Sequence, residues 1–170
     1  MERLIPLALL TSLICGACTP NAATLTLINH SPTDIKVSLD ERSRKINAGT
    51  FINLQSLKPG PHYVKVANTP IETVTLEPKR TTVLDIVGDG CYAVIDYTPQ
   101  YDSKLGGEVI IEERFKKQPS FTTRNPMTTP FGEPLPHKVD TGKHVRRLQS
   151  IDCSIITVDR AIIEAVSRLP

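Results

Sequence analysis

The stretch TTVLDIVGDGCYAVIDY, residues 81–97, carries the pattern that decides the fold. Two runs rich in Val, Ile and Thr, Thr81–Val87 and Cys91–Tyr97, stand on either side of Asp89-Gly90. Such residues favour a pleated, half-buried surface, so each run predicts a β-strand. Because Asp-Gly suits a tight turn between two strands, we expect the two runs to form a hairpin.

The first of these runs is apolar on both of its faces. Val83 and Val87 point to one side and Leu84 and Ile86 to the other, since side chains alternate along a strand. We therefore expect a central strand that is covered on both sides. Further runs of similar composition are Thr24–Leu27, Ile35–Leu39, Thr50–Leu54, His62–Ala67, Ile71–Leu76 and Glu108–Phe115. Short strands separated by turn residues predict a mainly β chain, an antiparallel β-sandwich of about seven or eight strands over residues 24–115.

Residues 57–66 read LKPGPHYVKV, with Gly60 at the position of a type II turn that requires a positive φ. Within Thr50–Leu76, this segment resembles the proline-glycine hairpin of PEGA-type modules, and it is similar to small immunoglobulin-like and transthyretin-like surface domains. The Pro-Glu-Gly-Ala tetrapeptide of that family is replaced here by Asn47-Ala48-Gly49-Thr50. The resemblance implies a non-catalytic module of an envelope protein.

The composition changes at residue 116. Five prolines between 118 and 136 exclude a helix or a central strand there. We interpret residues 116–147 as a proline-rich basic loop, or as an arm on the body whose anchors are Phe121, Met127, Phe131 and Leu135. Its cations are candidate contacts for an acidic partner, and a charged loop that only keeps the chain soluble is the alternative. The candidates are Lys116, Lys117, Arg124, Lys138, Lys143, Arg146 and Arg147.

The last segment, residues 148–170, combines a β-like run with a helical pattern. We expect a short strand that carries Cys153, and then an amphipathic helix on which Ile162, Val166 and Leu169 share a face. Thr157 or Asp159 would cap its start. Cys153 and Cys91 are a natural disulfide pair in an oxidising compartment, and closing a loop of about 60 residues stabilises by roughly 4 kcal/mol. Two separately buried thiols are the alternative.

Residues 1–17 have the pattern of an export signal. The apolar run Leu4–Ile14 spans only about 16 Å as a helix, which is half the thickness of a bilayer core. It ends in Cys15-Gly16-Ala17-Cys18, which resembles the lipobox of bacterial lipoproteins, although that family usually has Leu where Cys15 stands. The resemblance implies a diacylated Cys18, with residues 18–23 as lipidated N-terminus and spacer. Ordinary secretion and a retained helix are the alternatives.

The lipobox resemblance also implies a location. Thr19 rather than Asp follows the lipidated position, which by the habit of that family permits export to the outer membrane. We therefore expect a lipid anchor in the bacterial envelope, with the chain facing the periplasm.

Motifs of catalysis are missing from the sequence. It has no Gly-x-Ser-x-Gly, no His-Glu-x-x-His and no phosphate-binding glycine loop, and its four histidines lack ligand spacing with the cysteines. Lys and Arg number 20 against 18 Asp and Glu, so no strong field favours nucleic acid. We expect no enzyme, no cofactor and no metal site.

These features together predict a lipid-anchored, non-catalytic structural or adaptor component of a cell-envelope assembly, with an envelope protein as partner. The contact would be the loop 116–147 or an exposed sheet edge that accepts a further strand. A binding module for an anionic envelope polymer or polysaccharide is the alternative function.

Overall fold

The computed structural model describes residues 21–67, 69, 72–105 and 107–168. The expected signal segment 1–17 and the expected lipidation site Cys18 lie outside the described residues.

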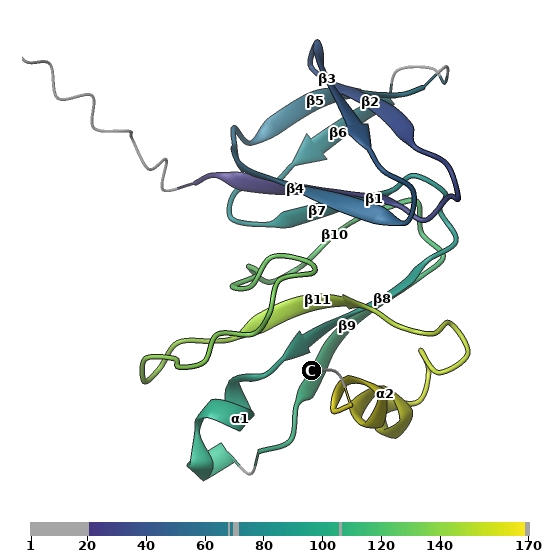
Figure 1. Ribbon diagram of the computed structural model, residues 1–170. Coiled ribbons are helices and arrows are strands. Elements are labelled where there is room, and N and C mark those ends of the chain that lie inside the picture. Colours follow the sequence, from purple (N-terminus) through teal and green to yellow (C-terminus); the bar gives the residue numbers. More distant parts are fainter. Residues whose placement is uncertain (1–20, 68, 70–71, 106, 169–170) are drawn as a thin grey trace, which may run out of the picture.

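Three β-sheets are stacked, and a short helix covers the last of them (Figure 1). The outer sheet has the order β3-β2-β5-β6, the middle sheet β10-β7-β1-β4 and the helix-side sheet β11-β8-β9. The strands are β1 (Ala23–Asn29), β2 (Ile35–Leu39), β3 (Arg42–Ile46), β4 (Thr50–Leu57), β5 (Gly60–Val66), β6 (Glu72–Leu76), β7 (Thr81–Asp85), β8 (Cys91–Asp96), β9 (Ile110–Lys116), β10 (Ser120–Thr122) and β11 (Arg146–Ser150). The helices are α1 (Thr98–Tyr101), the 3₁₀ turn η1 (Ser103–Leu105) and α2 (Asp159–Val166).

The mainly β class, the antiparallel sheets and the short C-terminal helix are confirmed. The described residues contain eleven strands rather than seven or eight, because β3, β10 and β11 join those that the patterns predict. β3 has the sequence RSRKI, in which apolar and polar residues do not alternate, so the sequence pattern does not predict this strand. β10 has only three residues and lies at an edge, where the prolines around it are tolerated.

The two central strands of the middle sheet, β1 and β7, are buried on both faces. Leu25 and Leu27 of β1 pack into a core with the outer sheet, while Ile28 and Val83 pack into a second core with the helix-side sheet. Every residue of β7 is buried, which confirms the expected central strand. β7 runs parallel to β1, whereas β4 and β10 run antiparallel to their neighbours.

The hairpin predicted at Asp89-Gly90 is wrong, because β7 and β8 belong to different sheets. The buried carboxylate of Asp85 gives the physical reason. It accepts backbone N–H groups from Val87 at 3.2 Å, Gly88 at 3.1 Å and Gly90 at 2.9 Å. These bonds turn the chain away at the end of β7 and lead it into the helix-side sheet. The edge of β7 that a hairpin would have used is occupied by β10.

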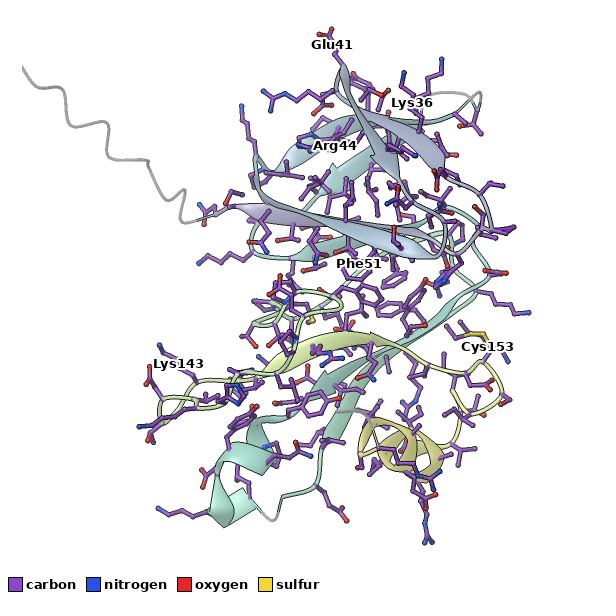
Figure 2. The ribbon with its side chains drawn as sticks, viewed as in Figure 1. Lys36, Glu41, Arg44, Phe51, Lys143 and Cys153 are labelled. Carbon is purple, nitrogen blue, oxygen red and sulfur yellow. A yellow bond between two sulfur atoms is a disulfide. The ribbon has the colours of Figure 1, made fainter. Side chains whose placement is uncertain are left out.

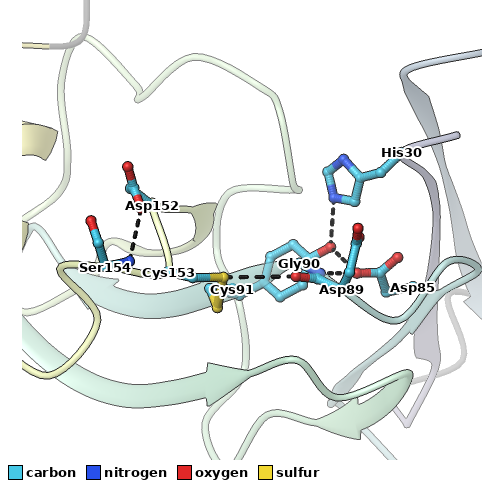
Figure 3. Close-up of a disulfide and its surroundings, with 9 residues drawn as sticks. His30, Asp85, Asp89, Gly90, Cys91, Asp152, Cys153 and Ser154 are labelled. Carbon is cyan, nitrogen blue, oxygen red and sulfur yellow. Dashed lines mark hydrogen bonds between the residues drawn. A yellow bond between two sulfur atoms is a disulfide. The ribbon is translucent and has the colours of Figure 1, made fainter. Parts of the chain in front are cut away.

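Tyr92, near the start of β8, links the helix-side sheet to the middle sheet, and its two hydrogen-bond partners, His30 and Asp85, are labelled in Figure 3. The fully buried Tyr92 donates its hydroxyl proton to Asp85 Oδ2 at 2.8 Å, and His30 Nε2 lies 2.8 Å from the same hydroxyl oxygen. Burial, together with the adjacent Asp85, raises the pKa of the Tyr92 phenol far above its ordinary value. The phenol therefore stays protonated and remains a hydrogen-bond donor between the two layers.

Cys91, next to Tyr92, forms a disulfide with Cys153, and their Cα atoms are 5.2 Å apart. The predicted pair is confirmed, but the strand expected around Cys153 is not. β11 ends at Ser150, and Cys153 lies in a turn in which the Asp152 carboxylate accepts the N–H of Ser154 at 2.8 Å. That local bond competes with a strand ladder, so the chain turns toward α2 instead.

The helix α2 covers the far face of the helix-side sheet. Its buried Ile162 and Val166 pack with Ala93 and Ile95 of β8. The predicted cap is wrong, because the N-cap is Val158 and no side chain bonds there. Asp159 instead makes an ion pair with Arg114 of β9, which orients the helix on the sheet.

Candidate functional site

Residues 117–145, which connect β9 to β11 and make up most of the predicted loop 116–147, lie as an arm across the middle and helix-side sheets (Figure 1). β10 adds its three residues to the edge of the middle sheet. Phe121, Met127 and Phe131 pack into the core between the two sheets, and Leu135 packs against the core beneath α2. The arm is therefore held by apolar contacts, in spite of its prolines.

The arm then runs along β11. The N–H groups of Thr128 and Thr129 both donate to the carbonyl of Arg146 at 3.1 Å. The Arg146 N–H in turn donates to Thr128 Oγ1 at 2.7 Å, and Thr129 bridges Arg147 in parallel. These bonds fix one wall of a cleft between the arm and the start of β11.

This basic cleft has a volume of about 490 Å³. Its lining combines prolines, threonine hydroxyls and several charged groups. The lining residues are Pro126, Thr128, Thr129, Pro136, Lys138, Val139, Asp140, Lys143, His144, Val145 and Arg146. A second hollow, of about 440 Å³, lies beside it and shares Val139, Asp140, Lys143 and His144. Three of the seven predicted contact residues, Lys138, Lys143 and Arg146, thus meet at one cleft.

The cationic charge of the cleft is largely compensated within the protein. Arg146 Nε lies 2.9 Å from both carboxylate oxygens of Glu112 on β9, and one terminal nitrogen lies 4.0 Å from Asp96. Only 15% of the Arg146 side chain is exposed. Lys143 pairs with Asp140 at 2.9 Å, and His144 Nδ1 lies 3.4 Å from Asp96. Among the described residues, Lys138 is in no ion pair.

The other four predicted contact residues lie elsewhere. Lys116 and Lys117 are exposed at the end of β9, where the N–H of Lys117 donates to the Gly90 carbonyl at 2.9 Å. Arg124 lies on Glu113, which accepts both its backbone N–H and its side chain. Arg147 has a buried Nε with no partner among the described residues. The seven residues do not make one continuous surface.

Sequence reasoning missed the acidic partners of the cleft. Glu112 and Asp96 belong to neighbouring strands of the helix-side sheet, and β9 is paired to β8 with a register shift after Val94. Nothing in the local pattern connects Glu112 with an arginine 34 positions later. Only the alternation of Glu112 and Glu113 on β9 hinted that each carboxylate has a different neighbour.

Within residues 21–67, 69, 72–105 and 107–168, no group of three or more His, Cys, Asp or Glu side chains is placed to hold a metal ion. Over the same residues, no helix has both the length and the apolar character that a membrane crossing needs.

Comparison with known proteins identifies no family for this chain. No protein-family model and no curated protein matches the chain. Among solved structures, the chain is similar to the N-terminal domain of AlgF from P. aeruginosa, with 15% identity and a TM-score of 0.35 over 55% of this chain and 95% of that one. A similarity of that extent carries no functional argument, so the candidate site rests on its geometry.

Proposed function

We propose that this chain is a non-catalytic, lipid-anchored adaptor of a bacterial cell envelope, which holds an envelope protein in the cleft between its arm and β11. The disulfide Cys91–Cys153 carries the proposal, because disulfides persist in oxidising compartments outside the cytoplasm. The lipobox resemblance at Cys18 supports the same compartment and supplies the anchor.

The buried polar groups support a structural rather than a catalytic role. Asp85 is saturated by backbone donors and Tyr92, and Glu113 by the backbone and side chain of Arg124. Asp96 accepts the N–H of Thr98 at 2.8 Å and also its hydroxyl. A catalytic carboxylate needs access to substrate, whereas each of these is at most 5% exposed and already engaged.

The pairing of charges in the cleft favours a protein partner over an anionic polymer. Arg146 and Lys143 are matched by Glu112 and Asp140, so Lys138 remains as the cation that a polymer would use. A polymer held by unpaired charge is released steeply by salt, whereas a contact with the prolines and threonines of the cleft is not.

Anchoring is tested by metabolic labelling with a fatty-acid analogue. We expect label on the full chain and none on Cys18→Ala, with the wild type recovered in the membrane fraction. An unlabelled wild type, or label that persists in Cys18→Ala, would reject the anchor.

The contact is tested by a photo-crosslinking residue placed at Pro136 in isolated cell envelopes, with the same residue at Arg160 as control. Pro136 lines the cleft and its replacement keeps Lys138, while Arg160 lies on α2 with 90% of its side chain exposed. We expect a discrete adduct from position 136 alone, formed equally when the envelopes are irradiated in low and in high salt. No adduct, or an equal adduct from position 160, counts against the cleft, and an adduct that forms only in low salt would favour the polymer.

A further inference from the structure

β3 and β4 are edge strands of two adjacent layers. β3 ends the outer sheet and β4 ends the middle sheet, and residues 47–49 carry the chain from one to the other (Figure 1). Between these two edges lies a groove of about 510 Å³, lined by Ser43, Arg44, Lys45, Ile52, Asn53 and Leu54. This edge groove lies far along the chain from the arm and shares no lining residue with the basic cleft.

The backbone of β3 has hydrogen-bonding groups that face this groove. The Lys36 carbonyl accepts from the Ala67 N–H, on the β5 side of β2. Because the backbone groups of successive residues point to opposite sides, those of Val37 face β3 and bond its register partner Arg44. The N–H and C=O groups of Ser43 and Lys45 therefore point outward, and the described residues contain no strand beyond β3 to receive them.

The groove has an apolar floor. Ile52 and Leu54 are half-buried and pack against the core between the outer and middle sheets. A side chain that entered from a strand beside β3 would cover them. Burying apolar surface in this way is the main favourable term in association.

The rim of the groove is cationic (Figure 2). Lys36 and Lys45 are directly opposite on β2 and β3, and Asp34 compensates only Lys45, at 2.6 Å. Arg44 forms no ion pair with any described residue, but it is opposite the buried Val37 and therefore lies on the groove side of β3. On the outward row, Lys36 is the cation without an acidic partner among the described residues. Like charges directly opposite destabilise a sheet, so an added acidic strand would relieve this pair.

Charged edge strands also protect proteins from pairing with copies of themselves. Two β3 strands side by side would bring Arg42, Arg44 and Lys45 against the same cations, which disfavours self-association at this edge. The same charges admit a strand of opposite sign. The charges of β3 therefore favour pairing with an acidic strand over pairing with another copy of β3.

We propose that the edge of β3 binds an extended segment of a partner protein, with alternating acidic and apolar residues, as an additional strand of the outer sheet. Its apolar side chains would cover Ile52 and Leu54, and its carboxylates would lie on the outward row beside Lys36 and Lys45. Main-chain bonds to Ser43 and Lys45 would give affinity, and the alternate side chains would give specificity.

The probe is a fluorescein-labelled peptide of about nine alternating Glu and Val residues, followed by fluorescence anisotropy with the folded chain. Ser43→Pro removes one outward N–H and leaves the β2–β3 bonds intact. Thr75→Pro is its matched control, since the same alternation makes Thr75 outward-facing on β6, the opposite edge of the sheet. We expect binding at least about tenfold weaker in Ser43→Pro and unchanged in Thr75→Pro.

The charge requirement is tested by Lys36→Glu/Lys45→Glu, which keeps a like-charged cross-strand pair but reverses its sign. We expect the Glu-Val peptide to lose binding to this variant and a Lys-Val peptide to gain it. No binding of the Glu-Val peptide to the wild type, or equal binding to Ser43→Pro, overturns the proposal. Lys138→Glu in the basic cleft must leave the peptide affinity unchanged, so failure at the edge groove and failure of the proposed adaptor cleft are distinguishable.

Discussion

The outer sheet and the helix-side sheet both pack on the middle sheet, but within the described part of the chain only one of them has its second face covered. The helix-side sheet carries α2 on that face, a disulfide at one end and a half-buried Arg146–Glu112 pair. The outer sheet presents Lys36, Lys45 and the 59% exposed Tyr63 to solvent. The two layers therefore differ in role. The helix-side sheet is stabilised by the contacts on its second face, whereas the outer sheet leaves its charged side chains exposed for binding.

The disulfide is the strongest of these fastenings. It closes a loop of 62 residues, so we expect Cys91→Ala/Cys153→Ala to lower the free energy of unfolding by about 4 kcal/mol. Urea titration with and without reductant measures this loss. If the comparison holds, reductant lowers the urea midpoint of the wild type and leaves that of the double variant unchanged. An unaltered wild-type midpoint under reductant would contradict it.

The covering helix gives the next largest effect. Ile162 is fully buried against the helix-side sheet, and we expect Ile162→Ala to cost about 3 kcal/mol through lost burial and a cavity. Tyr63→Ala on the bare face of the outer sheet is the matched substitution, with an expected cost below about 1 kcal/mol. Thermal unfolding followed by circular dichroism compares the two. Equal losses would show that the outer face is covered in solution.

The ion pairs of the two layers should also differ. Removing Arg146 leaves Glu112 without its cation at a site where neither side chain is more than 18% exposed, so Arg146→Ala should cost about 2 kcal/mol. The Lys45–Asp34 pair on the outer sheet is 66% and 44% exposed, and Lys45→Ala should cost less than about 0.5 kcal/mol. Urea titration at low and high salt separates them, since salt should diminish only the second. A cost for Arg146→Ala as small as that for Lys45→Ala would remove this difference.

The smallest expected effect is a pH dependence of the outer sheet. Burial lowers the pKa of His62, but the Lys58 carbonyl and the Asp40 carboxylate outweigh it, so the net pKa is raised. A raised pKa stabilises the fold fully below the unfolded value of about 6.5, and the stabilisation is lost as pH rises through the folded value. We expect His62→Gln to cost less than about 1 kcal/mol at pH 5.5 and still less at pH 8.5. A larger cost at the higher pH would have the wrong sign.

The sequence predicted most of the strands because they alternate or are apolar throughout, as β7 and β8 show. It failed where a single long-range contact decides. In the sequence, Asp85 looks like an ordinary polar residue before a Gly-Asp-Gly turn. In the structure, its carboxylate accepts hydrogen bonds from Gly90 and Tyr92, and the chain continues into another sheet. The seven candidate cations are close together in the sequence and suggest one basic surface. In the structure they lie at different places, because some of them bind different acidic partners such as Glu112 and Glu113. Those partners lie on β9, which no local pattern connects to the arm.

The position of β1 has a kinetic consequence. The first described strand becomes an interior strand of the middle sheet, where it needs β4 on one side and the later β7 on the other. Contacts between distant parts of a chain are slow to form, because loop-closure entropy must be overcome first. Leu25, Leu27 and Ile28 therefore stay exposed while the remainder is being made or refolded. During that interval this short apolar segment is exposed and prone to aggregate.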